Sequence, residues 1–227
     1  MESPTILGAI PGLNTFEPYV TYSWLAMILL IGTALAVRSK LSLVPSGIQN
    51  FMEIFADFFL TTSENNIGHH YGEKFYPLLG TIFLYILTCN LFGLIPGFES
   101  PTSNINMTAS MAIPVFLIYQ FYGFKVHGVS YLKHFLGPIR SIAAIPFMIF
   151  MFFLELIGHL VRPITLSVRL FGNMFAKHIL LIVLAILAPA IIPAAILFLG
   201  TLISFIQAYV FMLLTTLYLA GAVEEAH

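Results

Sequence analysis

The sequence predicts an all-α polytopic membrane protein, and its composition and the length of its apolar runs carry that prediction. Of the 227 residues, 59% are hydrophobic and only 8% are charged, whereas soluble domains average about 45–50% and ~25%. The apolar runs are long enough to cross a bilayer, which takes about 20 helical residues. This excludes soluble globular and disordered proteins, and a net charge of −1 excludes a basic surface for nucleic acid. We expect a single membrane domain over residues 1–227.

The first half of the chain contains three predicted spans. Residues 20–37 form the first, which stops at Arg38. The second covers residues 75–95 and ends at the turn-forming pair Pro96-Gly97. A polar, turn-rich stretch then leads to the third span at residues 109–122.

Residues 47–62 predict a shorter amphipathic helix between the first two spans. Its apolar residues recur at offsets of three and four and share one face; they are Ile48, Phe51, Met52, Phe55, Phe58 and Phe59. Asn50, Glu53 and Asp57 fall on the other faces. Such a helix lies in the membrane interface or against a neighbouring subunit, or it packs under a loop of the same protein.

Residues 142–187 predict one steeply inclined helix. Their length as a helix is about 69 Å at 1.5 Å per residue, too long to stand upright in a hydrocarbon core of ~30 Å. The chain either reverses near Pro163 or continues as a bent helix. No Gly, Asn or Asp flanks Pro163 to reverse the chain, so we favour the bent, inclined helix. Residues 191–221 form the last helix.

The cationic residues predict the orientation. Those outside the long apolar stretch cluster in two loops, after the first span and after the third: Arg38, Lys40, Lys74, Lys125, Lys133 and Arg140. By the positive-inside rule both loops are cytoplasmic. Five spans then leave the N-terminus outside and the C-terminus in the cytoplasm.

Polar and charged residues also occur inside the last long apolar stretch. Several of them belong to one stripe of residues at offsets of three or four, which is polar or small apart from Leu166: Glu155, His159, Arg162, Leu166, Arg169, Asn173 and Ala176. The last helix has a matching row: Gly200, Ser204, Gln207 and Phe211. A charge at mid-membrane costs about 2.5–3.5 kcal/mol or more and usually marks an ion path. We expect two facing helices that present an acid, an arginine and amides at membrane depth.

Four motifs resemble the family of subunit a of the F-type ATP synthase. The most specific runs from Pro163 to Met174 and centres on Arg169. The others run from Gln207 to Leu214, Asn90 to Pro96 and Pro101 to Thr108. With the order of the five spans, the resemblance covers nearly the whole chain.

The resemblance implies a non-catalytic, ion-translocating subunit. Subunit a is the stationary partner of a rotating ring of c subunits, and it supplies two offset half-channels to the ring carboxylates. The implied partners also include the peripheral-stalk b subunits and membrane lipid, in a bacterial inner membrane. No cofactor, metal, nucleic acid or directly bound nucleotide is expected, and the last two helices should form an inclined hairpin.

The resemblance also implies roles for individual residues. Arg169 matches the essential arginine that faces the ring, where its permanent charge favours proton loss from a carboxylate and blocks leakage. Glu155 matches an acidic position of the cytoplasmic half-channel, and His178 matches a titratable position of the outer one. Asn173 and Gln207 match polar positions beside the arginine, although a hydrogen bond that only packs the helices is an alternative for both.

Four further residues are possible lining residues of the half-channels: Gly200, Ser204, His159 and Lys177. Gly200 matches a position that carries His in some members and would lie opposite His178. Lys177 stands where a small residue is common, so it either snorkels outward or adds positive charge beside the inlet. Asn104 stands where many members have Asp.

Two other functions would also place charges inside a membrane. A membrane metalloprotease could use His159 and His178 as ligands, but the chain lacks the His-Glu-x-x-His pattern. A self-contained channel or secondary transporter is the stronger alternative. Such a protein would conduct ions on its own, whereas the ATP synthase subunit would need the ring of c subunits. The coupling ion stays open, with the proton favoured, because the surroundings of the ring carboxylate would select it.

Overall fold

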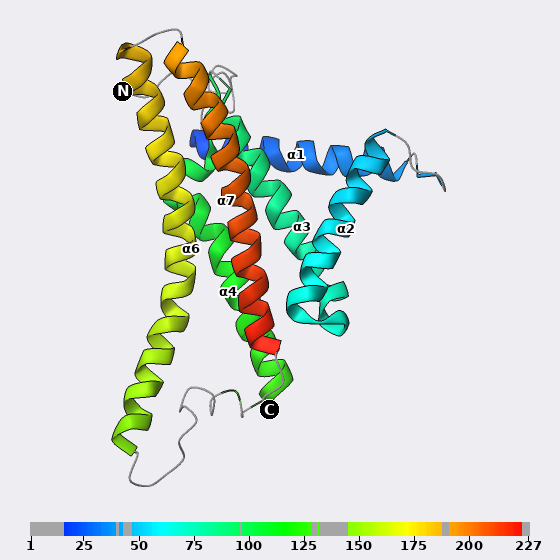
Figure 1. Ribbon diagram of the computed structural model, residues 1–227, viewed down its shortest axis with the longest axis vertical. Helices are drawn as coiled ribbons and strands as arrows, with labels where there is room; N and C mark the ends of the chain where they lie inside the picture. The colour runs from blue at the N-terminus through cyan, green and yellow to red at the C-terminus, as the bar shows by residue number, and fades with distance from the viewer. Residues whose placement is uncertain are drawn as a thin grey trace.

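The described part of the protein is entirely helical (Figure 1). The computed structural model describes residues 16–39, 41–42, 47–95, 97–128, 131, 145–187 and 191–223. The elements in these ranges are α1 (Pro18–Arg38), α2 (Ile48–Ile67), α3 (His69–Phe92), the 3₁₀ turn η2 (Pro101–Ser103), α4 (Ile105–His127), α6 (Ile145–Leu187) and α7 (Ile191–Val223). No strand occurs in them, which confirms the all-α prediction.

Five of the helices are long and apolar enough to cross a membrane. They are α1, α3, α4, the Pro146–Leu180 part of α6 and the Leu197–Val223 part of α7. This confirms the polytopic prediction. The helices α3 and α4 begin before the apolar runs from which the spans were predicted, because polar residues such as His69 and Asn106 belong to their first turns. At the start of α4, the Asn104 side chain caps the helix by accepting a hydrogen bond from the Asn106 N–H at 2.9 Å.

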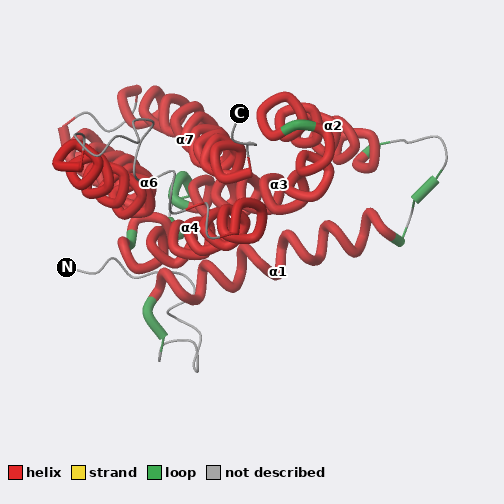
Figure 2. The backbone as a smooth tube through the Cα atoms, turned by 90° about the horizontal axis from the view of Figure 1, so that it is seen from below, coloured by secondary structure: helices red, strands yellow, loops and turns green. Residues whose placement is uncertain are grey.

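The chain does not reverse at Pro163. Helix α6 is continuous for 43 residues with Pro163 in its interior, as we favoured from the sequence. The 33-residue helix α7 returns antiparallel beside it, and Figures 1 and 2 show the two lying side by side. Helix α1 runs across this pair rather than along it (Figure 1).

The central helix α3 packs against α1, α2 and α7, while α4 packs against α6 and α7. The main core is formed by large side chains from these helices, including Leu79, Phe83, Leu166, Leu170, Phe211 and Met212. These contacts hold the middle of α6 against α7 and α4, so residues on opposite sides of α6 meet different surroundings.

Helix α2 buries only part of its apolar face within this chain. Phe59 packs against α3, where Gly80 leaves room for its ring: a Cβ at Gly80 would lie 2.8 Å from Phe59 Cδ2. Phe51 and Ile54 on the same helix stay 57% and 60% exposed. The helix thus packs against neighbouring helices of its own chain and leaves a second apolar strip uncovered.

Candidate functional site

The polar side chains of α6 form three groups along its length. The first lines a cavity near residues 155–162, the second surrounds Arg169, and the third lies around Lys177. At 1.5 Å per residue, Glu155 and Arg169 are about 21 Å apart along the helix, and Arg169 and Lys177 about 12 Å. The three groups are therefore separate sites on one helix.

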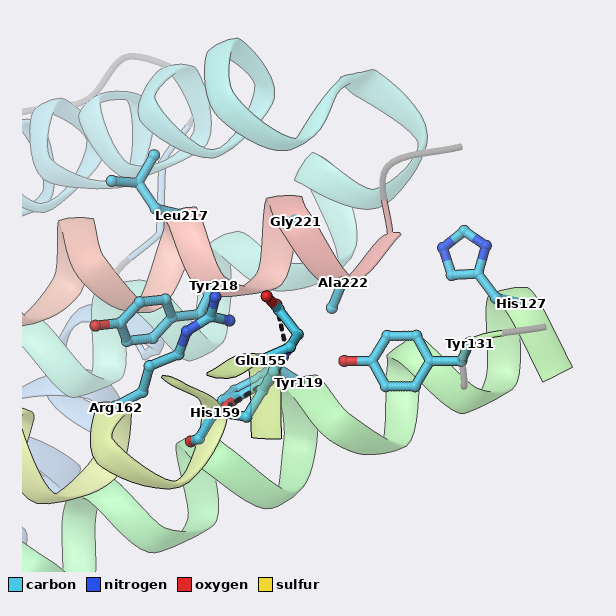
Figure 3. A pocket seen from close by; sticks show the side chains of 10 residues that line it. All are labelled: Tyr119, His127, Tyr131, Glu155, His159, Arg162, Leu217, Tyr218, Gly221 and Ala222. Carbon is cyan, nitrogen blue, oxygen red and sulfur yellow. Dashed lines mark hydrogen bonds and ion pairs between the residues drawn. The ribbon is translucent and has the colours of Figure 1, made fainter. Parts of the chain in front are cut away.

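The first group lines a cavity of about 140 Å³ between α4, α6 and α7 (Figure 3). Its lining residues are Tyr119, His127, Tyr131, Glu155, His159, Arg162, Leu217, Tyr218, Gly221 and Ala222. Burial raises the pKa of the Tyr131 phenol, and the Arg162 charge opposes that shift. An acid, two imidazoles and a guanidinium thus share one polar cavity with three tyrosine rings.

Glu155 and His159 form a connected pair on successive turns of α6. Glu155 Oε1 lies 3.3 Å from His159 Nε2, and His159 Nδ1 lies 3.3 Å from the Tyr119 hydroxyl. The Glu155 side chain is half exposed, whereas His159 is buried. The pair therefore links an accessible carboxylate to a buried imidazole, which is an arrangement suited to passing a proton.

Arg162 is held between two tyrosines. Its guanidinium carbon lies 5.1 Å from the ring centre of Tyr218 on α7 and 5.9 Å from that of Tyr119 on α4. Both distances are in the range of cation–π attraction. From the sequence Arg162 was placed only in the polar stripe, without a role, because the tyrosines that hold it lie on other helices.

Arg169 lies on an exposed face of α6. No described residue lies within hydrogen-bond or ion-pair distance of its guanidinium. One turn further on, the Asn173 side-chain amide donates a hydrogen bond to Gln207 Oε1 on α7 at 2.7 Å. The structure thus brings Asn173 and Gln207 together next to Arg169, while the arginine itself faces away from the fold.

Lys177 is buried, with 6% of its surface exposed. Its Nζ donates to the backbone oxygen of Asn90 and to Ser204 Oγ, both at 3.3 Å. Of the two alternatives for Lys177, outward snorkelling is therefore wrong, because the side chain is buried. Its stem finds space over Gly200, where an added Cβ would lie 3.1 Å from Lys177 Cδ.

His178, the neighbouring residue, is exposed. Because successive residues of a helix point about 100° apart, it does not share the direction of Lys177. Of the two, Lys177 lies over Gly200. The expected pairing of His178 with Gly200 is replaced by a pairing of Lys177 with Gly200.

The polar stripe does not face a single environment. Glu155, Arg169 and Asn173 are exposed, whereas His159 and Leu166 are buried against the other helices. The row on α7, by contrast, is buried along its whole length: Gly200, Ser204, Gln207 and Phe211.

Comparison with known proteins shows the family of this chain. The sequence model described as ATP synthase A chain matches residues 20–220. The chain belongs to the ATP synthase A chain family. It is 47% identical to ATP synthase subunit a of Trichlorobacter lovleyi and 48% to that of Citrifermentans bemidjiense; each alignment covers 92% of this chain and 88% of the relative. The subunit a of Geobacter sulfurreducens is 45% identical over the same shares.

Membership of the ATP synthase A chain family confirms the resemblance read from the four motifs. It makes the chain a multi-pass component of the membrane sector of an ATP synthase. Two of those motifs also contain polar residues to which the sequence gave no role. Asn90 on α3 and Thr102 on η2 form a buried hydrogen bond of 2.6 Å beside Lys177.

Proposed function

We propose that this chain is the stationary proton-translocating subunit of a rotary ATP synthase. It provides two offset half-channels that pass protons to and from carboxylates of a rotating c-subunit ring. The subunit itself is non-catalytic, and ATP chemistry belongs to other subunits. The observation that carries this proposal is the exposed guanidinium of Arg169, which has no partner among the described residues, on a helix long and apolar enough to cross a membrane.

A lone cation on the surface of a membrane helix is costly, so it needs an anion from outside the chain. Exposed apolar side chains flank the face of α6 that carries Arg169: Ile164, Val168 and Phe175 are 59%, 47% and 48% exposed. On that face itself, the exposed neighbours one turn away are Thr165 and Asn173. An apolar partner helix with one carboxylate at mid-membrane fits both features. The c ring presents such helices, and the long α6–α7 hairpin offers it an extended contact surface.

The two half-channels are assigned to the groups on either side of Arg169. Glu155 and His159 in the cavity form the cytoplasmic one, with Glu155 as its accessible acid. The Lys177 group, with Ser204, Gly200 and the nearby His178, forms the outer one. The positive-inside rule supports this orientation, with the N-terminus outside and the C-terminus in the cytoplasm of a bacterial cell.

Arg169 separates the two half-channels. As a ring carboxylate arrives, the guanidinium stabilises its ionised form, so the proton leaves through one half-channel. Because the guanidinium stays charged at any working pH, it also repels a proton that would pass directly between them. The Asn173–Gln207 hydrogen bond fixes α6 to α7 at this level. Peripheral-stalk b subunits and lipid would cover other exposed apolar surfaces.

Cross-linking in the whole complex tests the proposed contact with the ring. Thr165 and Ala176 are exposed on the Arg169 side of α6, and Ile113 is exposed on α4. Each position is changed to Cys in turn and labelled with a benzophenone maleimide, which inserts into any neighbouring chain on illumination. We expect covalent adducts with the c subunit from positions 165 and 176 and not from 113. The absence of c-subunit adducts from both α6 positions would contradict the proposal.

The alternative is a self-contained channel or transporter. A purified chain in liposomes should then conduct protons without a ring. Under our proposal it conducts little, because no ring carboxylate carries the proton from one half-channel to the other.

A further inference from the structure

The buried ammonium of Lys177 is an unusual feature of the polar layer between α3, α6 and α7. It is 6% exposed, and both acceptors of its hydrogen bonds, Asn90 O and Ser204 Oγ, are neutral. Within the described ranges no carboxylate lies within ion-pair distance of Nζ. Since a buried charge is costly without an opposite charge, a cation at this position needs a functional explanation.

The two residues that contact this ammonium, Asn90 and Ser204, belong to a wider hydrogen-bond network. Thr102 Oγ1 donates to Asn90 Oδ1 at 2.6 Å, and Asn90 Nδ2 donates to the Ser204 backbone oxygen at 3.4 Å. Ser100 Oγ is 2.8 Å from Thr102 Oγ1 and donates to the Cys89 oxygen at 2.9 Å. Two oxygens of these residues, Asn90 O and Ser204 Oγ, contact the ammonium, and carbonyl and hydroxyl oxygens are the ligand types that hard metal cations bind.

The lysine is fitted into this network as a tethered cation. Its stem lies over Gly200, close enough that an added Cβ there would be 3.1 Å from Cδ. Leu94 closes the same space, with its Cδ2 3.0 Å from that position. The ammonium therefore occupies the place between the oxygens that a free cation would otherwise take.

We infer that Lys177 makes this half-channel selective for protons over metal cations such as sodium. The inference rests on the proposed function. A sodium ion would have to displace the tethered ammonium or approach it closely, and a fixed charge in a narrow polar site is a barrier to other cations. A proton passes by exchange instead. At each step of that exchange one O–H bond of a water or hydroxyl breaks and another forms on the next oxygen, so the proton moves past the ammonium while Lys177 keeps its charge.

Sodium sensitivity of proton flux tests this inference. The whole complex is placed in vesicles, and potential-driven proton uptake is compared in sodium chloride and in choline chloride on both sides. The variants are Lys177→Met and Lys177→Gln, which remove the charge, and Lys177→Arg, which keeps it. We expect equal flux in the two salts for the parent and for Lys177→Arg. Sodium should inhibit the two neutral variants at concentrations at least roughly tenfold lower than any that inhibit the parent, the order expected for removing one nearby unit charge.

The outcomes separate this inference from the proposed function. Equal sodium responses in the parent and in both neutral variants would overturn the selectivity role. So would a sodium-sensitive Lys177→Arg variant. Arg169→Ala is measured alongside in choline, and full coupling in that variant would overturn the proposed function instead. Two neutral variants of different polarity are used so that failure of one to assemble leaves the other to decide.

Discussion

The three cations inside α6 lie in three different environments. Arg162 lies between the rings of Tyr119 and Tyr218, Arg169 is exposed without a partner among the described residues, and Lys177 is buried among neutral oxygens. Of the three, only the two arginines keep their charge at any working pH. The environments follow from the neighbouring helices, because α4 and α7 cover the faces that bear Arg162 and Lys177 but leave the face of Arg169 open.

Arg162 should stabilise the packing of α6 against α7 through its contact with Tyr218. The variants Arg162→Met and Tyr218→Leu should each lower stability, and the double variant should lose less than the sum. A coupling of about 0.5–2 kcal/mol is expected for one cation–π contact. Thermal unfolding of the detergent-solubilised complex measures it. Fully additive losses would show that the contact contributes nothing.

Glu155 and His178 should act as proton relays on opposite sides of Arg169. The variants Glu155→Ala and His178→Ala should each lower coupled proton flux, because each removes a group that exchanges protons with water. Glu155→Asp serves as the control that keeps the carboxylate. ATP-driven acidification of vesicles measures the flux, with immunoblotting to show that the subunit is still assembled. Flux at the parental rate in both Ala variants would contradict the assignment of the half-channels.

At the scale of the helices, α6 is longer than an upright span allows. Its 43 residues correspond to about 65 Å at 1.5 Å per residue, against a hydrocarbon core of ~30 Å. We therefore expect the helix to be strongly inclined, and the antiparallel packing of α7 along it shields the polar groups between the two. The proline in its interior removes one backbone hydrogen bond without ending the helix.

We predict that α6 is tilted by about 60° from the membrane normal, beyond the usual 0–40° range. Nitroxide labels placed one at a time along its exposed face, at positions such as Phe153, Ile164 and Phe175, would report their depth. Depth should change by roughly 0.75 Å per residue, half the helical rise. A change close to the full 1.5 Å per residue would show an upright helix and contradict the prediction.

Much of this architecture could be predicted from the sequence because it depends on local patterns. The length of the apolar runs predicted five spans, and the absence of Gly, Asn or Asp around Pro163 predicted one continuous helix. The contacts of Arg162 and Lys177 could not be predicted in the same way. They depend on Tyr119, Tyr218 and Asn90, which lie on other helices at sequence distances that no periodicity connects.

At the scale of the whole molecule, the α6–α7 hairpin carries two polar groups, one around Glu155 and one around Lys177. Arg169 lies between them on α6 and faces outward. Neither group alone crosses a membrane, since each lies toward one end of α6. Under the proposed function, a proton passes from one to the other only on a carrier that moves past Arg169. Each proton crossing yields ~2.3 kcal/mol per 100 mV, and this energy drives rotation only if entry and exit stay separate.

The most direct test of this account is proton coupling in Arg169→Ala, measured in membrane vesicles that contain the whole complex. Both ATP-driven pumping and potential-driven ATP synthesis are followed, with Arg169→Lys as the comparison. We predict that the Ala variant assembles but loses coupled pumping and synthesis, because no fixed cation then favours proton loss from the ring carboxylate. Arg169→Lys should restore little, since a desolvated lysine can deprotonate. Near-normal coupling in the Ala variant would contradict the central claim.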